Sequence, residues 1–99
     1  MSHLTGRDPA GTGLWVRPAK KVIDDPVDDY HCGTVGTGWL SGGHPLPSDG
    51  VVSRKVCFKY NGIDCNWETN VDVVNCNNDY YVYYLVDAPI CALGYCTET

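Results

Sequence analysis

Six cysteines in a chain of 99 residues constrain the fold more than any other feature. A chain this short buries a modest fraction of its surface, so a hydrophobic core alone leaves it marginally stable. An even number of cysteines, together with many Gly, Pro and Asn residues, is typical of a disulfide framework in a small extracellular domain. We therefore predict one small, disulfide-rich domain with three bridges, although the cysteine spacing does not by itself select the pairing.

The clearest strand patterns lie in the second half of the chain. Residues 51–60 and 66–74 each alternate between apolar and polar side chains, which predicts two half-buried strands. The Asn61-Gly62 pair between them is a strong turn signal because both residues tolerate positive φ. Two further strands are predicted at 80–86, which is apolar or aromatic on both faces, and at 90–95. The sequence therefore predicts an all-β fold of antiparallel hairpins.

The first half of the chain has weaker patterns. Residues 1–13 show no periodicity and are predicted to be a disordered lead-in, so that the single β domain spans 14–98. Residues 14–17 predict a short first strand, with Trp15 in the core because its large ring is costly to expose in so small a domain. A short edge strand is also predicted at 21–23.

A long Gly-rich loop is predicted at residues 33–50. This stretch has six glycines and two prolines, which favour irregular structure. Its largest apolar anchor is Trp39-Leu40, which we expect to hold the loop against the core.

The charge balance excludes some classes of partner. Twelve acidic residues against seven basic ones give a formal charge of −5. Nucleic acid and anionic membrane surfaces both require a basic footprint, so we expect neither as a partner. The longest apolar run, around residues 82–86, is far shorter than a membrane span, and residues 1–13 have no apolar leader pattern. We therefore expect an excised domain without direct membrane insertion, whose signal peptide is not in this chain.

The sequence shows no assembled metal or catalytic motif. The cysteines form no C-x-x-C pair, and His31 beside Cys32 is more typical of a loop histidine than of a ligand. Residues 77–79 and the acidic residues of 24–29 lack the spacing of a calcium loop. We predict a protein that is not an enzyme, with no catalytic residues, no metal ligands and no cofactor. The rival hypothesis, a reduced metal-thiolate or cysteine-dependent domain, predicts free thiols.

Aromatic side chains are the candidates for binding. Four tyrosines between residues 80 and 84, with Trp39 and Trp67, supply more aromatic surface than a small core easily hides. Aromatic residues are favoured in recognition patches, although the same residues could instead pack beneath a covered sheet face. We select Tyr81, Tyr83 and Trp39 as candidate binding residues. The predicted function is a non-catalytic interaction module with an extracellular protein or glycan partner. The alternative is a carbohydrate- or microbe-binding domain.

Several short words in the sequence carry a family resemblance. The words CGTVGTGWLSGGHP, DGVVSRKVCFKYNG, CNW, YYVYYL and C-x-x-x-x-C-T resemble the eight-cysteine domain of uromodulin, the pancreatic zymogen-granule glycoprotein and related zona-pellucida-module proteins. The resemblance covers residues 32–98 and implies a secreted or membrane-anchored extracellular glycoprotein. In uromodulin and the pancreatic glycoprotein this domain belongs to a decoy module that displays a glycan to bacterial adhesins. This chain contains no N-x-[ST] site, which argues against that role here.

The resemblance also implies a disulfide pattern. It pairs Cys32 with Cys96 and Cys57 with Cys65. The family's partners of the two remaining cysteines lie upstream at positions this chain lacks, so we infer a third pair, Cys76 with Cys91.

Overall fold

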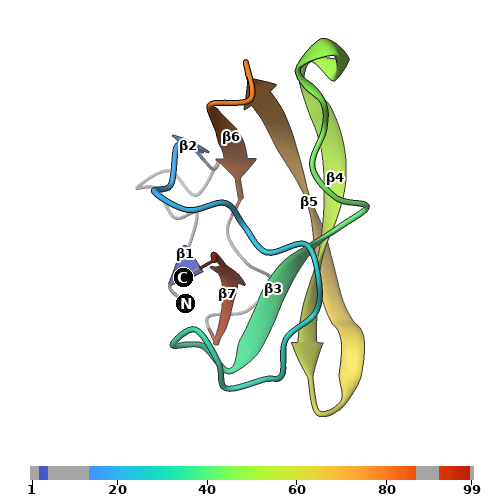
Figure 1. Ribbon diagram of the computed structural model, residues 1–99. Helices are drawn as coiled ribbons and strands as arrows, with labels where there is room; N and C mark the ends of the chain where they lie inside the picture. Colours follow the sequence, from blue (N-terminus) through green and yellow to red (C-terminus); the bar gives the residue numbers. More distant parts are fainter. Residues whose placement is uncertain (1–2, 5–13, 87–91, 99) are drawn as a thin grey trace.

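The computed structural model describes residues 3–4, 14–86 and 92–98 of the chain (Figure 1). Within these residues the regular structure is almost entirely β, as predicted. In chain order the elements are β1 (His3–Leu4), β2 (Leu14–Val16), β3 (Gly36–Ser41), the short 3₁₀ helix η1 (Pro47–Asp49), β4 (Val52–Tyr60), β5 (Ile63–Cys76), β6 (Tyr80–Leu85) and β7 (Leu93–Cys96).

The strands form one curled sheet in the order β1-β7-β3-β4-β5-β6-β2. All neighbouring strands are antiparallel except β3 and β7, which run parallel. The two short N-terminal strands therefore occupy the two edges of the sheet, β1 beside β7 and β2 beside β6. This arrangement pairs β6 and β7, which would otherwise be exposed edge strands.

The β4–β5 hairpin forms where the alternating pattern predicts it. Its turn has Asn61 at φ 53° and Gly62 at φ 77°, the left-handed conformation that these two residue types tolerate. The apolar face of both strands enters the core, where Phe58 and Val73 are fully buried. Each such buried side chain contributes about 1.5–3 kcal/mol to folding.

The predicted Gly-rich loop is a loop only in part, because residues in its first half form β3, an interior strand of the sheet. This strand lies between β4 and β7 and is largely buried. Its glycines are required by close packing. A Cβ atom at Gly38 would lie 2.7 Å from the Gly94 carbonyl oxygen, and one at Gly36 would lie 2.1 Å from the Leu93 side chain. Glycine at these positions allows the neighbouring backbone to approach closely, whereas residue propensity alone predicts a loop for a stretch so rich in glycine.

Residues 18–32 form a crossing segment that runs over one face of the sheet, seen in front of the strands in Figure 1. Val22 enters the core and pairs with Thr97 in an isolated β-bridge, within the predicted edge strand 21–23. The Ile23 N–H donates to the Cys96 carbonyl at 2.9 Å, and the Leu40 N–H donates to the Ile23 carbonyl at 2.8 Å. The crossing segment is thereby fixed to both β3 and β7.

The N-terminal residues differ from the sequence prediction in two places. His3 and Leu4 pair with Cys96 and Tyr95 as β1, within the stretch predicted to be a disordered lead-in. The predicted first strand forms as β2, but Trp15 is 49% exposed and is not a core residue. Because β2 is an edge strand, the Trp15 ring lies at the margin of the sheet, where it makes an edge-to-face contact with Tyr84 at 5.3 Å between ring centroids.

Candidate functional site

Two disulfides join described residues of the chain, and they are two of the pairs that the family resemblance implies. Cys32–Cys96 joins the crossing segment to β7 with a Cα–Cα distance of 5.9 Å and is buried. Cys57–Cys65 joins β4 to β5 near their turn with a Cα–Cα distance of 4.7 Å. Both distances lie in the usual range for two cysteines joined by a disulfide.

The third expected pair is not present in the described part of the chain. Cys76 ends β5 and carries a half-buried free thiol. Its expected partner, Cys91, lies outside the described residues. The next residue, Ala92, accepts hydrogen bonds from Val35 and Gly36, at the end of the sheet opposite to Cys76. Because a disulfide needs Cα atoms within about 7 Å, the placement of Ala92 argues against the inferred pair.

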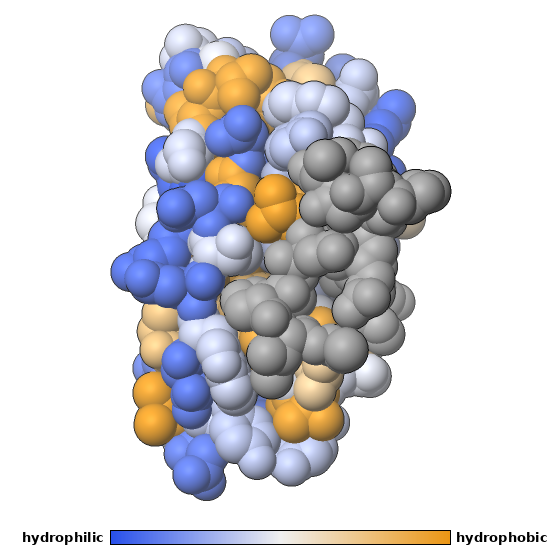
Figure 2. All heavy atoms as spheres, turned by 180° about the vertical axis from the view of Figure 1, so that it is seen from behind, coloured by the Kyte–Doolittle hydropathy of each residue, from blue (hydrophilic) through white to orange (hydrophobic). Residues whose placement is uncertain are grey.

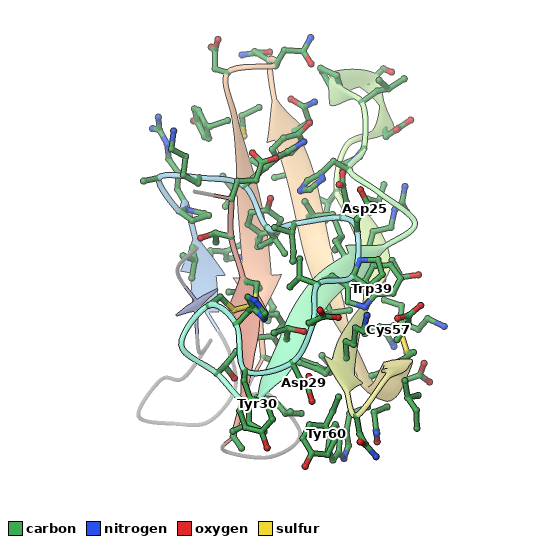
Figure 3. All side chains as sticks on the ribbon, turned by 60° about the horizontal axis from the view of Figure 1, so that its bottom comes forward. Asp25, Asp29, Tyr30, Trp39, Cys57 and Tyr60 are labelled. Atoms are coloured by element: carbon green, nitrogen blue, oxygen red, sulfur yellow. A yellow bond between two sulfur atoms is a disulfide. The ribbon has the colours of Figure 1, made fainter. Side chains whose placement is uncertain are left out.

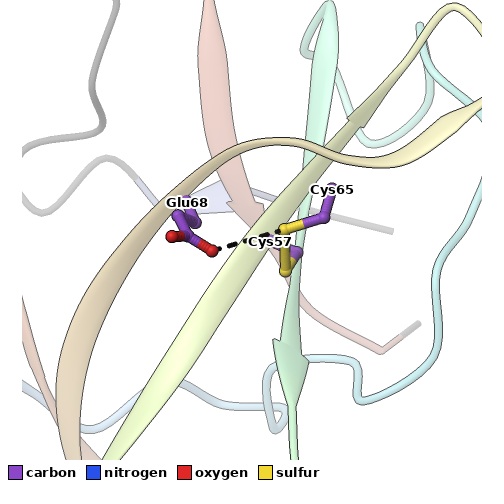
Figure 4. A group of neighbouring side chains, drawn as sticks. All are labelled: Cys57, Cys65 and Glu68. Atoms are coloured by element: carbon purple, nitrogen blue, oxygen red, sulfur yellow. Dashed lines mark hydrogen bonds between the residues drawn. A yellow bond between two sulfur atoms is a disulfide. The ribbon is translucent and has the colours of Figure 1, made fainter.

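One group of potential metal ligands lies around the shorter bridge. The Glu68 carboxylate is 3.8 Å from the Cys65 sulfur, and Cys57 is the third member (Figure 4). Thiolates bind metals, but here both sulfurs are consumed in their own disulfide. Glu68 also lies 3.4 Å from the Lys55 ammonium. The group is therefore a cross-strand contact and does not make a metal centre in the oxidised protein.

The structure separates the three predicted binding residues. Tyr83 has no exposed surface, so its selection as a contact residue is corrected: it is a core residue. Trp39 is half-buried, packs against the Cys32–Cys96 bridge, and donates its indole N–H to the Asp64 carbonyl at 2.9 Å. Tyr81 is half-buried and lines a surface pocket. Of the three, Tyr81 is the residue best placed to meet a partner.

The pocket that Tyr81 lines has a volume of about 250 Å³ and is called the Tyr81 pocket below. Three chain segments form it: the start of the crossing segment, the β5–β6 turn and the C-terminal end. Its lining residues are Pro18, Ala19, Lys20, Lys21, Asn78, Asp79, Tyr80, Tyr81 and Glu98. Ammonium, carboxylate, amide and phenol groups therefore converge on one hollow.

Ion pairs and a hydrogen-bonded turn fix the walls of this pocket. Lys21 lies 3.8 Å from the Glu98 carboxylate and 4.0 Å from that of Asp24, all partly exposed. On the opposite wall, the buried Asn75 side chain accepts a 2.8 Å hydrogen bond from the Asn78 N–H. The pocket is thus formed by ordered segments of the fold.

Next to the pocket lies a chain of polar groups that the sequence did not reveal: the Tyr83 and His44 side chains are buried and that of Asp24 is partly exposed. The Tyr83 hydroxyl accepts a hydrogen bond from the Val22 N–H at 3.1 Å and lies 2.6 Å from His44 Nε2. His44 Nδ1 faces the Asp24 carboxylate at 3.4 Å. The His44 ring also packs against Tyr81, with 4.3 Å between ring centroids. A lone histidine in a Gly- and Pro-rich stretch gave no signal of this role.

The protonation states follow from the geometry. The Tyr83 hydroxyl oxygen accepts a hydrogen bond from the Val22 N–H, so the hydroxyl proton is free to be donated to His44 Nε2. Nε2 is then the acceptor nitrogen of the neutral ring, and the ring proton lies on Nδ1, which faces Asp24. Burial lowers the pKa of His44, and the nearby Asp24 carboxylate opposes this only in part. Burial likewise raises the pKa of Tyr83. The imidazole of His44 and the phenol of Tyr83 are therefore both uncharged in the folded protein at neutral pH.

Apolar surface does not gather into one patch on the face shown in Figure 2. The apolar side chains form separate spots between hydrophilic ones. Large continuous apolar patches mark obligate interfaces. A contact on this face of the described residues would therefore involve polar as well as apolar groups.

The fold and its bridges define a class: a small extracellular β module held by disulfides. The model of the uromodulin-like D8C domain family matches residues 16–97, so the chain belongs to this family. The match begins well before Cys32, where the sequence resemblance was first recognisable, and includes the whole crossing segment. Within the described residues no helix has the length and apolar character of a membrane span.

The chain is similar to several secreted or membrane-associated glycoproteins. It is 40% identical over 81 residues to the pancreatic secretory granule membrane major glycoprotein GP2 of Rattus norvegicus, covering 79% of this chain and 15% of the relative. It is 40% identical over 78 residues to uromodulin of Mus musculus, covering 79% and 12%. The chain thus spans a small fraction of the relatives it matches. The domain is an extracellular glycoprotein module.

Proposed function

We propose that this domain is a non-catalytic binding module that contacts an extracellular protein through the Tyr81 pocket. The observation that carries the proposal is the convergence of three separate chain segments on one ordered hollow with mixed charges and two tyrosines. Tyrosine and charged side chains around a well-packed centre are typical of recognition surfaces. The scaffold that presents them is held by the Cys32–Cys96 bridge, which ties the crossing segment to the sheet.

The Asp24–His44–Tyr83 chain supports a non-catalytic role. Asp24, His44 and Tyr83 follow the order carboxylate, imidazole, hydroxyl that nucleophilic triads use. A nucleophile must reach its substrate, however, and Tyr83 has no exposed surface. Burial also raises the pKa of Tyr83, which disfavours the phenolate. These three groups therefore act to tie the crossing segment to the sheet.

The size of the pocket favours a protein partner over an enclosed small molecule. Pockets that enclose drug-sized ligands hold about 300–1,000 Å³, whereas this one holds about 250 Å³. Such a hollow suits a single side chain that protrudes from a partner surface. The surrounding lysines and carboxylates would then form a polar rim.

The test is to immobilise the domain and quantify the proteins it retains from the extracellular fluid of its source tissue. We expect two variants to lose the partners of the wild type. Lys20→Glu reverses a charge at the rim of the pocket, and Tyr81→Ala removes an aromatic ring from its wall. Lys55→Glu, which reverses the same charge at a half-exposed β4 residue that does not line the pocket, is the matched control. Retention of every partner by both pocket variants would overturn the proposal.

A glycan is the second candidate partner, favoured by one observation. Tyr80 and Tyr81 line the same pocket as the Asn78 amide and the Asp79 carboxylate, a combination of aromatic rings and hydrogen-bonding groups. The Arg17 guanidinium, however, lies 3.6 Å from the centre of the Tyr80 ring and covers one of its faces. A glycan array separates the two candidates, since glycan binding predicts hits that Tyr81→Ala removes.

A further inference from the structure

An aromatic cluster lies at the other end of the sheet, beside the β4–β5 turn. Tyr30, from the crossing segment, lies 6.2 Å from Tyr60 at the end of β4, measured between ring centroids. Tyr60 in turn lies 5.8 Å from Trp67 on β5. Trp67 packs against the core, whereas Tyr30 is 68% exposed. The cluster therefore leads from the core to solvent and ends in an open tyrosine ring, seen beside Tyr60 in Figure 3.

The backbone at Tyr30 has an unfavourable conformation that the surrounding contacts impose. Tyr30 adopts φ 61°, a left-handed conformation that bulky residues rarely take because it is strained. Its N–H donates to the Val35 carbonyl at 2.9 Å, and Cys32, two residues on, is anchored by the long disulfide. Such a conformation persists only where the surroundings impose it. The contacts on either side of Tyr30 therefore fix the backbone from which this exposed ring projects.

The loop that carries Tyr30 is also fixed to the hairpin that carries Tyr60. The Asn61 N–H donates to the Asp29 carboxylate at 3.0 Å. The hairpin itself is cross-linked by Cys57–Cys65 on either side of its turn. Both tyrosines are therefore presented by bridged segments, and a partner would meet them with little loss of conformational entropy.

Carboxylates surround this aromatic cluster. Lys59 lies between two of them, 3.2 Å from Asp28 and 3.4 Å from Asp64, and both carboxylates raise the pKa of Lys59. Asp29 adds a third carboxylate beside the tyrosines. Three carboxylates against one ammonium leave an excess of negative charge. The ammonium of Lys59 shows that a cation is favourably held among these groups.

We propose that the Tyr30–Tyr60 rings and the carboxylates of Asp28, Asp29 and Asp64 form a docking site for a basic peptide segment, with an arginine stacked on Tyr30. The rings are tilted by 55° to each other, which makes an angled wall and not the flat platform that suits a sugar ring. A guanidinium stacks on an aromatic face and pairs with carboxylates at the same time. The site goes beyond the proposed function, because it uses the end of β5 opposite to the Tyr81 pocket.

The test is an NMR titration of the ¹⁵N-labelled domain with a blocked tetra-arginine peptide. We expect saturable shifts of the Tyr30 and Asn61 amides, with the Tyr81 pocket unaffected. Tyr30→Leu should weaken binding about fivefold, since it removes the π face but leaves the core intact. Tyr30→Phe, the matched control, should bind about as well as the wild type, and Asp28→Asn should bind about twofold more weakly.

Three outcomes would overturn the site. Equal binding by Tyr30→Leu and wild type would show that net charge alone attracts the peptide. Equal shifts with a blocked tetra-glutamine peptide would show that no cation is recognised. Saturable shifts at Tyr30 with a neutral oligosaccharide and none with tetra-arginine would assign the surface to a glycan. Because the two surfaces lie apart, none of these results bears on the Tyr81 pocket.

Discussion

His44 is the residue through which this fold is most sensitive to pH. Its ring is almost fully enclosed between the crossing segment and β6, where Asp24, Lys21 and Glu98 are the charged groups around it and Tyr81 and Tyr83 contact it. If Nε2 were protonated, it would donate to the Tyr83 oxygen, which already accepts from Val22, and the tyrosine proton would lose its acceptor. Protonation therefore works against this arrangement.

We predict that the free energy of unfolding falls as the pH is lowered below about 6.5, the ordinary pKa of histidine. The folded-state pKa of His44 lies below that value, so the unfolded chain binds more protons over this interval and stability rises with pH. Urea unfolding from pH 7.5 down to 5 measures the effect. In His44→Gln the free energy of unfolding should change less steeply with pH than in the wild type. An equally steep change in that variant would assign the pH dependence to other groups.

Two aromatic residues show the limits of sequence reasoning at this scale. Trp15 was predicted to be buried and is half exposed, whereas Tyr83 was predicted to be a contact residue and is fully buried. Residues 80–86 are apolar or aromatic on both faces, so alternation could not tell which face enters the core. The crossing segment packs over Tyr83 and thereby decides which face of β6 is buried. No local pattern in the sequence encodes that packing.

At the scale of the element, β3 is where the sequence and the structure differ most. The stretch GTGWLS contains two glycines and was predicted to be part of a loop, yet it is an interior strand of the sheet. The β4–β5 hairpin, in contrast, was predictable because its alternation and its Asn-Gly turn are both local signals. Glycine in β3 has a tertiary cause, the close approach of β7, which becomes visible only when the partner strand is known.

We predict that Gly38→Ala destabilises the domain by about 1–3 kcal/mol. The new Cβ atom would lie 2.7 Å from the Gly94 carbonyl oxygen and from the Phe58 ring, and the backbone atom cannot move aside without shifting β7. Chemical denaturation measures the loss. Gly36→Ala is an informative companion, since its nearest obstacle is the Leu93 side chain. Wild-type stability in Gly38→Ala would contradict the observed packing of β3 against β7.

At the scale of the whole molecule, the two bridges contribute unequally. Cys32–Cys96 spans 64 residues and Cys57–Cys65 spans 8. Restriction of the unfolded chain grows with loop length, which gives about 4 kcal/mol for the long bridge and about 2.5 kcal/mol for the short one. We predict that the Cys32→Ala/Cys96→Ala variant melts at a lower temperature than Cys57→Ala/Cys65→Ala. The reverse order in calorimetry would show that local packing outweighs chain closure.

The disulfide framework is the central claim, because it underlies the compartment, the fold and both proposed surfaces. Peptide mapping of the native protein, alkylated before any reduction, tests it most directly. We predict that Cys32 is linked to Cys96 and Cys57 to Cys65, and that Cys76 is alkylated as a free thiol. Alkylation of the four bridged cysteines in native protein, or their recovery in other pairs, would contradict the account and return the reduced metal-thiolate domain as the leading hypothesis.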